Sequence, residues 1–508
     1  MFPRFSTACQ KFTSHSSSLF RIHLLFLPPT STHTLHHHHP SRSFSTFTRI
    51  LWKERQEPLV LPHSNENNKV YTSRPVSFWM DQIAEKEKQR EKKNADKIQT
   101  TTERVLIEKT MRDSYTDIYL PFKSSPELLE QYIFVDGGIR TGKLLEDLDN
   151  LAYIIASKHA ENFDPNASPI TMVTASMDRL DLFLPKVVEN YKLSGNVTYV
   201  GSSSMEILIK AEIVPEGADV DALIADKENI DVTNNSKLDA NTILITRFTM
   251  VAIDAKTHKP IKINPLRATS PEEERLIEVA KKNKMRKKLE AEKSLDQQPP
   301  TAQESLEMHR MYLEASQYMH PQHDNGDDFI VPANGEKQRL PSNCVWMADT
   351  RMDNLIFCHA QFRNSHGNIF GGFIMRMAVE LSYCTASTFL HSSSAVVLSM
   401  DRVTFRKPVF VGSLLSMKAG IVYSLGSPHS SFQVRVVASV IDIEKNTKEI
   451  TNEFYFTMAP LDHQVTVPRV LPHTYAETIH WLDGKRRRTF GKRARSRLLE
   501  DLALPDLP

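Results

Sequence analysis

Two stretches of the chain combine a glycine-rich turn with a helical pattern of apolar residues. After Gly142, apolar residues recur every three or four positions through residues 144–155. After Gly372, residues 373–390 are apolar on nearly all sides of a helix. The pattern therefore predicts two core helices, each beginning directly after a glycine-rich turn.

Alternation of polar and apolar residues predicts strands around both helices. One short strand is expected before each helix, at 115–121 and 345–357. The strands expected after the helices are 170–184, 193–200, 204–214 and 242–254 in the first half, and 396–405, 414–423, 432–443 and 450–458 in the second. One long apolar helix for each antiparallel sheet indicates an α+β fold in which the sheet wraps around the helix.

Short identical sequences indicate that the two halves are copies of one unit. Ser-Met-Asp-Arg occurs at 176–179 and 399–402, and Phe-Thr-Met occurs at 248–250 and 456–458. The copies are 223 and 208 residues apart (399−176, 456−248), and the two helix-starting glycines are 230 apart (372−142). Such similar offsets predict an internal repeat whose copies differ in loop length.

The first segment, residues 1–53, has the composition of a transit peptide. It contains no Asp or Glu, and its Arg and Lys residues are scattered among Ser, Thr and Phe. The expected location is the mitochondrial matrix, with the chloroplast as the alternative. The expected order after this segment is a charged helical extension, a first domain, a charged linker, a second domain and a basic tail, at 54–112, 113–262, 263–342, 343–460 and 461–508.

The remaining composition is that of an ordinary soluble protein and points to no particular partner. The net charge is +2, and no apolar run approaches the roughly 20 residues of a membrane helix. The basic run at 281–288 is flanked by Glu and lacks interleaved aromatic residues, so a solvated linker helix rather than a nucleic-acid contact is expected there. For the basic residues at 485–497 a solvated C-terminal helix is expected. The four cysteines lack CxxC spacing, and neither a metal site nor a cofactor is expected.

One motif resembles a known family. His366-Gly-Asn368-Ile-Phe-Gly371-Gly372, followed by Phe-Arg-Lys-Pro-Val-Phe-Val-Gly at 405–412, is similar to the hotdog-fold acyl-CoA thioesterases. The paired halves resemble more closely the mitochondrial double-hotdog acyl-CoA thioesterase 9 type. The resemblance implies tandem hotdog domains, acyl-CoA as substrate, fatty acid and coenzyme A as products, and a homo-oligomer formed through hotdog packing.

The resemblance also implies a composite active site. In the family, one hotdog supplies an Asn at the start of its helix, and its partner supplies an acidic residue two turns into its own helix. The Asn position is Asn368 in the second half but Gly138 in the first. The acid position is Asp149 in the first half but Val379 in the second. The pair of Asp149 with Asn368 is therefore complete only across the two halves.

Each of these residues has a functional and a structural interpretation. Asp149 would act as a general base on water or attack the thioester to form an anhydride; alternatively, it lies on the outer face of its helix. Asn368, with backbone N–H groups of Gly371 or Gly372, would polarise the thioester oxygen. The alternative for Asn368 is a turn residue, since Asn readily adopts a left-handed conformation.

Other polar residues are weaker candidates. His366, Arg402 and Arg406 are possible substrate-binding residues, the arginines for the phosphates of coenzyme A. Glu380 lies one residue past the acid position and could form a second site with Asp136. A rotation of about 100° for each helical residue makes this second site unfavourable.

Two other functions are compatible with a hotdog fold. A hydratase would need a catalytic His paired with an acid, and no His stands at either acid position. A non-catalytic acyl-CoA-binding or scaffold protein would retain the site residues only as relics. The survival of one component in each half argues against general decay.

Overall fold

The computed structural model describes most of the chain from residue 105 onward. The described residues are 105–162, 170–185, 187–215, 231–254, 257, 259–318, 339–364 and 367–502, with side chains up to 496. The predicted transit peptide, most of the predicted extension at 54–112, and His366 lie outside them.

The first half forms a six-stranded antiparallel sheet around one long helix, α5 (Thr141–Ala160). The strand order is β12-β3-β7-β6-β5-β2. The elements of this half are β1 (Lys109–Thr110), α3 (Met111–Ser114), β2 (Thr116–Leu120), α4 (Pro126–Tyr132), β3 (Ile170–Met177), β4 (Leu180–Asp181), β5 (Tyr191–Val200), β6 (Ser204–Ile213), a 3-10 turn (Val232–Ser236) and β7 (Thr242–Asp254).

The second half repeats this arrangement around α9 (Gly371–Leu390), with the strand order β10-β13-β14-β15-β11-β4. Its elements are β9 (Cys344–Trp346), two 3-10 turns (Met347–Thr350 and Ala360–Phe362), β10 (Met352–Phe357), β11 (Ala395–Met400), β12 (Val403–Thr404), β13 (Leu414–Tyr423), β14 (Phe432–Asp442) and β15 (Thr447–Pro460). The predicted tandem hotdog fold is confirmed.

The two halves exchange two short strands, β4 and β12. β4 belongs to the first half in sequence but pairs with β11 of the second, where Leu180 lies opposite Met400. β12 belongs to the second half but pairs with β3, where Val403 lies opposite Met177. The predicted single strands at 170–184 and 396–405 are therefore each broken, because the chain crosses into the other sheet at this point.

The two central helices contact each other closely at their glycines. A Cβ atom on Gly142 would lie 3.0 Å from Arg376 Cγ, and one on Gly372 would lie 2.8 Å from Glu146 Cα. The two contacts are equivalent, because Gly372 lies 230 residues after Gly142 (372−142) and Arg376 lies 230 residues after Glu146 (376−146). We call residues 230 apart in α5 and α9 counterparts, and likewise residues 223 apart in β3 and β11, where a bulge interrupts both strands after Thr174 and Val397.

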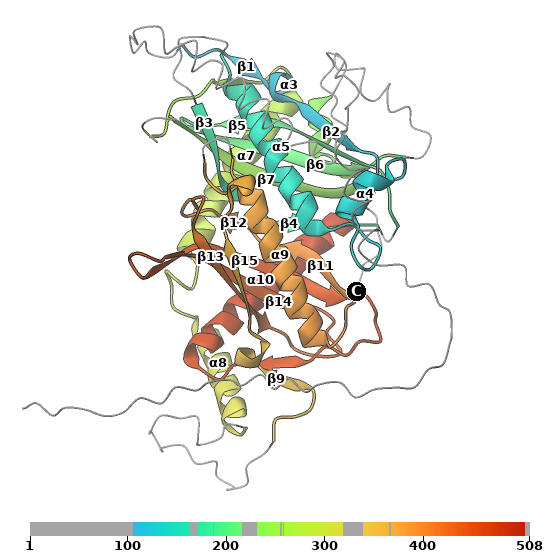
Figure 1. The fold of residues 1–508 in the computed structure, drawn as a ribbon, viewed down its shortest axis with the longest axis vertical. Coiled ribbons are helices and arrows are strands. Elements are labelled where there is room, and N and C mark those ends of the chain that lie inside the picture. The colour runs from blue at the N-terminus through green and yellow to red at the C-terminus, as the bar shows by residue number, and fades with distance from the viewer. Residues whose placement is uncertain are drawn as a thin grey trace, which may run out of the picture. The chain divides into compact units, whose positions relative to one another are not determined.

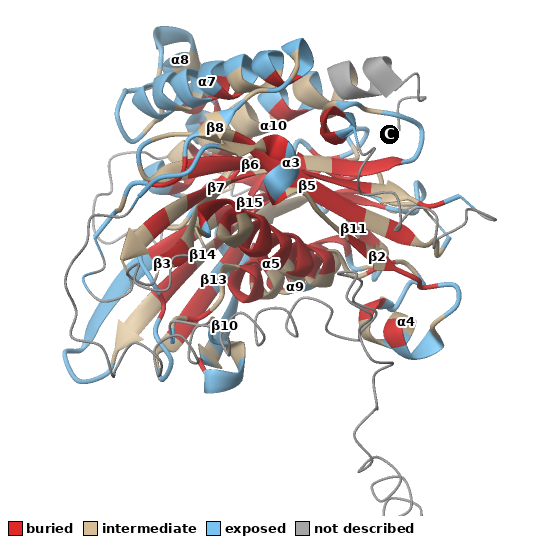
Figure 2. Ribbon diagram, turned by 90° about the horizontal axis from the view of Figure 1, so that it is seen from above, coloured by how far each residue is buried: buried red, intermediate tan, exposed pale blue. Residues whose placement is uncertain are grey.

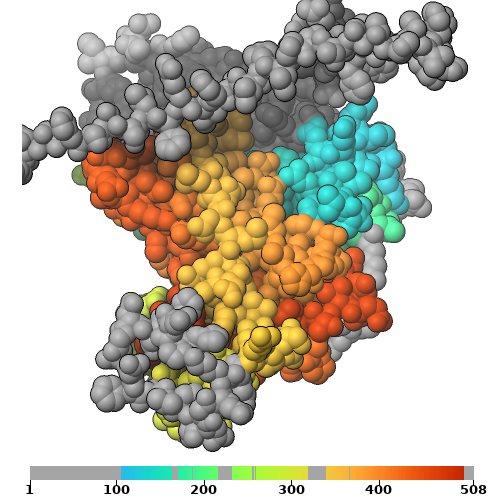
Figure 3. Space-filling model, turned by 60° about the horizontal axis from the view of Figure 1, so that its bottom comes forward, coloured from blue at the N-terminus to red at the C-terminus, as the bar shows by residue number. Residues whose placement is uncertain are grey.

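Figures 1 and 2 show how the helices and sheets are layered. The buried helices α5 and α9 lie together on the concave side of the strands, and α7 (Pro271–Glu292) lies on the opposite side. On the face drawn in Figure 3, the surface of the first half adjoins that of the second. None of the described helices is both long and apolar enough to cross a membrane.

The linker and tail contain helices that are attached to the core. On the mostly exposed α7, Lys287 forms an ion pair with Asp178 at 2.7 Å. α8 (Ala302–Ser316) is linked to α10 (Tyr475–Leu502) by the ion pair of Glu304 with Arg486 at 2.6 Å. The remaining elements are β8 (Leu266–Arg267), which pairs with β1, and β16 (Arg469–Leu471), which pairs with β9.

The C-terminal helix differs from the solvated helix expected from its sequence. Trp481 and Leu482 of α10 are 3% and 1% exposed. The Arg487 guanidinium lies 3.7 Å from the centre of the Tyr455 ring. The expectation was wrong because the arginines of α10 pair with groups on the sheets and on α8, which a count of charges does not reveal.

Candidate functional site at the junction of the two halves

Asp149 of α5 is completely buried against the second half of the chain. Its Oδ2 atom accepts a hydrogen bond from the Gly372 N–H at 2.6 Å, and its Oδ1 atom accepts one from the Thr174 hydroxyl at 2.8 Å. The interpretation that placed Asp149 on the outer face of its helix is therefore wrong. Its carboxylate joins α5, β3 and the start of α9.

Glycines at the start of α9 make this contact possible. A Cβ atom on Gly371 would lie 2.9 Å from Asp149 Oδ2, closer than real side chains approach. The N-terminal N–H groups of a helix have no partner within the helix, and the helix dipole favours negative charge there. Gly371 and Gly372 thus let a carboxylate from the other half reach the positive end of α9.

The surroundings of Asp149 set its protonation. Burial raises the pKa of the carboxyl group to about 6, whereas the hydrogen bonds from Thr174 and the Gly372 N–H act in the opposite direction. The group is therefore ionised at neutral pH and binds a proton readily just below it. These are the properties of a general base that operates near pH 7.

Asn368 lies in the loop that leads directly into α9. Its backbone N–H donates to the Asn364 side-chain oxygen at 3.1 Å, and its carbonyl accepts from the Asn364 N–H at 2.7 Å. The residue also forms a bridge with Phe410. Asn368 is half-buried, and its loop ends at the same Gly371-Gly372 pair that contacts Asp149.

The structure changes the assignment of one backbone donor. The Gly372 N–H was a candidate for polarising the thioester oxygen together with Asn368. It instead donates to Asp149, so its role in this structure is to hold the carboxylate. Gly371, its neighbour, is the remaining glycine donor candidate at the helix start.

A second carboxyl group, which sequence reasoning did not single out, lies two residues before Asp149. Asp147 is 4% exposed and accepts a hydrogen bond from the Tyr132 hydroxyl at 2.6 Å. Burial raises its pKa to about 7. Nearby, Glu146 forms ion pairs with Lys143 at 2.9 Å and with Arg376 at 3.4 Å.

The predicted phosphate-binding arginines already have acidic neighbours. Arg402 is 3.5 Å from a carboxylate oxygen of Glu290, and Arg406 is 3.2 Å from one of Glu453. Their assignment to substrate stays a prediction. The other residue that the sequence did not reveal is Thr174, because it lies 25 positions after Asp149 and leaves no local signal.

Comparisons with known proteins identify the family of this chain. The Thioesterase superfamily matches residues 366–443. The chain is 33% identical to the mitochondrial acyl-coenzyme A thioesterase 9 of Bos taurus over 410 residues, which cover 80% of this chain and 84% of the bovine protein. It is 34% identical to the Homo sapiens protein of that name over 378 residues, covering 74% and 77%.

Among solved structures, an acyl-CoA hydrolase from Staphylococcus aureus in complex with butyryl coenzyme A is 26% identical. It covers 30% of this chain and 92% of its own, with a TM-score of 0.28. The similarity to the bovine and human proteins extends over both halves of the chain. The chain therefore belongs to the family of mitochondrial acyl-coenzyme A thioesterases of type 9.

Proposed function

We propose that Asp149 and Asn368 form one composite site that hydrolyses fatty acyl-CoA. As a member of its family the chain is a thioester hydrolase of mitochondria, rather than a hydratase or a scaffold. The observation that carries the site assignment is the contact of the buried Asp149 with the start of α9, only four residues after Asn368. Each half supplies one component, so both are needed for one reaction.

These groups have the chemical properties that thioester hydrolysis needs. Asp149, as a base, takes a proton from a water molecule whose oxygen adds to the thioester carbonyl carbon. Asn368, with the Gly371 N–H, stabilises the negative charge that develops on the carbonyl oxygen. When the carbon–sulfur bond breaks, the proton passes to the thiolate, which leaves as coenzyme A. Direct attack by Asp149 to form an anhydride, which water then opens, needs the same groups.

The test compares hydrolysis of an acyl-CoA series by the full chain and by its Asn368→Ala variant. Hydrolysis is measured as the release of free coenzyme A thiol. Loss of one oxyanion donor is expected to lower kcat by about 10²–10³. Asn364→Ala is the matched control, because Asn364 is in the same loop and contacts Asn368. If Asn364→Ala abolishes turnover and Asn368→Ala does not, the role belongs to Asn364.

The location and assembly are also part of the proposal. The matrix is the proposed compartment, and import of the full chain into isolated mitochondria, with protease protection after the outer membrane is ruptured, tests it; uptake by chloroplasts instead would contradict it.

Self-association is supported by Leu355, Phe357 and Phe410, which are 59%, 50% and 58% exposed around β10 and the loop before β13. Light scattering should give a mass above 58.0 kDa; the monomer mass would refute association.

A further inference from the structure

The other end of the helix pair contains a cavity where the counterparts of the catalytic residues lie. Its volume is about 320 Å³, at the lower end of the roughly 300–1,000 Å³ of small-molecule sites. Gly142, at the start of α5, lines it, as does Val379, the counterpart of Asp149 (379−149 = 230). Val397, the counterpart of Thr174, lines it too (397−174 = 223).

The two ends therefore differ in chemistry more than in architecture. The hydrogen-bonded pair of Asp149 and Thr174 is replaced by two valines. Gly138, which also lines the cavity, stands at the position of Asn368. Without an acid or an amide at these positions, this end has none of the groups proposed to hydrolyse a thioester.

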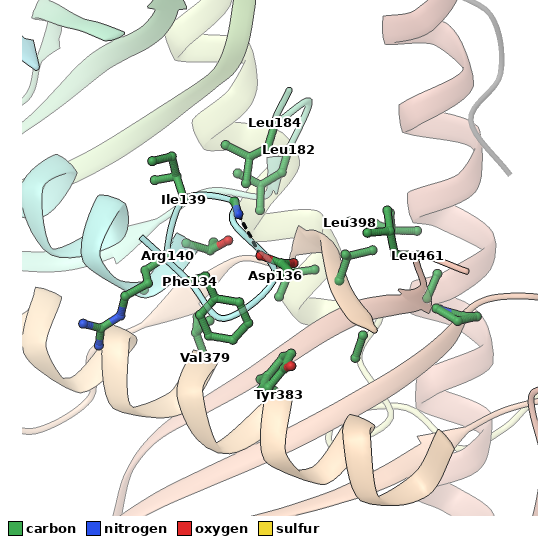
Figure 4. Close-up of a pocket in the computed structure, with 18 of the residues that line it drawn as sticks. Phe134, Asp136, Ile139, Arg140, Leu182, Leu184, Val379, Tyr383, Leu398 and Leu461 are labelled. Atoms are coloured by element: carbon green, nitrogen blue, oxygen red, sulfur yellow. Dashed lines mark hydrogen bonds between the residues drawn. The ribbon is translucent and has the colours of Figure 1, made fainter. Parts of the chain in front are cut away.

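The cavity walls are predominantly apolar. Figure 4 shows Val379 and Tyr383 of α9 facing leucines from both halves across the cavity. The apolar lining comes from Phe134, Ile139, Leu182, Leu184, Leu398 and Leu461. A long hydrocarbon chain fits such walls, because it needs burial of apolar surface and no hydrogen-bond partner.

Three of the charged residues that line the cavity, Arg140, Glu380 and Asp136, have protein partners. Arg140 forms an ion pair with Glu380 at 2.5 Å, and its side chain points away from the leucines in Figure 4. Asp136 accepts the Gly138 N–H at 2.8 Å. The interpretation of Glu380 with Asp136 as a second catalytic site is thus replaced by one in which Glu380 balances Arg140.

The C-terminal helix braces the cavity. The Arg495 guanidinium donates to the carbonyl oxygens of Leu182 and Leu398, both at 3.1 Å. It also lies 4.6 Å from the centre of the Phe183 ring, another lining residue. Because Leu182 and Leu398 come from different halves, Arg495 fixes both walls at once. The shape of the cavity is therefore held by specific hydrogen bonds from α10 to both halves.

We propose that this cavity binds a long acyl chain without hydrolysing it. The chain can come from acyl-CoA or from the free fatty acid that the composite site releases. This inference rests on the proposed function in one respect: the composite site at the opposite end binds an acyl thioester. Hydrolysis at that site is measured separately. Each methylene buried in the cavity is expected to tighten binding roughly fourfold.

The experiment counts acyl chains bound at equilibrium by full-chain Asp149→Asn, in which turnover is suppressed. Dialysis against labelled palmitoyl-CoA should give two chains for each polypeptide. Adding Leu461→Trp, at the cavity rim and 45% exposed, should reduce this to one, as should Leu184→Trp from the other half. Leu425→Trp is the matched control: Leu425 is 39% exposed and not among the lining residues, so two should remain.

The same variants without Asp149→Asn should hydrolyse acyl-CoA at the parental rate within about twofold, which separates this site from the composite one. Free palmitate is also expected to bind in the cavity. If only palmitoyl-CoA binds there, the cavity is still an acyl-chain site, and the bound chain comes from the thioester rather than from the free fatty acid. A single bound chain in the parent, two chains in both rim variants, or displacement by coenzyme A without an acyl group would overturn the proposal.

Discussion

The two ends of the helix pair are equivalent parts of an internal repeat, and they differ in a few side chains. At one end, Asp149 is buried, accepts two hydrogen bonds and touches the start of α9. At the other, Val379 faces an apolar cavity at the start of α5. In the proposed site each half supplies one component, and the single chain holds the two halves together so that Asp149 reaches the start of α9.

The largest effect among the substitutions around the carboxylate is expected for the helix-starting glycines. A methyl group on Gly372 would meet the backbone of Glu146 at 2.8 Å and displace the N–H that holds Asp149. Gly372→Ala should lower stability by about 1–3 kcal/mol and hydrolysis by at least about tenfold. Urea unfolding and thiol release measure the two effects.

Gly142→Ala is the matched change at the cavity end. Its methyl group would meet Arg376 at Cγ, 3.0 Å away, and at the backbone oxygen, 3.2 Å away, which is less close than the 2.8 Å contact of Gly372 with the Glu146 backbone. Gly142 also holds neither of the two proposed catalytic groups. Its effect on hydrolysis should be smaller than that of Gly372→Ala. A greater loss of hydrolysis in Gly142→Ala would show that the ends have been assigned the wrong way round.

The next effect concerns the hydrogen bond from Thr174. This bond lowers the pKa of Asp149, so Thr174→Val should move that pKa above its value of about 6. Because the base must be ionised, hydrolysis falls as pH drops through this pKa, and the acid limb of kcat/KM should shift upward. A net bond energy of about 1 kcal/mol corresponds to a several-fold loss on that limb.

Val397→Thr is the reciprocal change and adds the hydroxyl at the cavity end. The pH profile of kcat/KM should remain parental in this variant, since Asp149 is untouched. An unshifted limb in Thr174→Val, with a shifted one in Val397→Thr, would refute the role given to Thr174.

The smallest effect on hydrolysis is expected at Asp147, whose counterpart is Met377 (377−147 = 230). Burial raises the pKa of Asp147 from 3.8 to about 7, so the folded state holds its proton more tightly than the unfolded state. The stability from this group is full below about pH 3.8 and is lost up to about pH 7, by about 1.4 kcal/mol for each pH unit. Asp147→Asn should therefore show a weaker decline in unfolding free energy between pH 5 and 7.

Urea titrations at the two pH values compare Asp147→Asn with the parent. Asp149 has a raised pKa in both proteins, so its contribution cancels in the difference. An identical decline in the two proteins would mean that Asp147 is not protonated preferentially in the folded state.

Much of the fold follows from local patterns, whereas contacts between distant segments do not. Helical periodicity located α5 to within a few residues, and the repeated Ser-Met-Asp-Arg revealed the two copies. Strand exchange through β4 and β12 was missed, because two-residue strands leave no alternation to detect. The position of Asp149 on its helix was predictable, but its bond to Thr174 depends on how β3 packs against α5.

The most direct test gives the two ends the same substitution. Asp149→Ala and Val379→Ala remove counterpart side chains from a helix pair that is otherwise unchanged, and thiol release from palmitoyl-CoA is measured for both. We expect Asp149→Ala to lower kcat by about 10²–10⁴, and Val379→Ala to stay within a few-fold of the parent. Equal losses in the two variants, or full turnover by a folded Asp149→Ala, would show that Asp149 is not the base of the composite site.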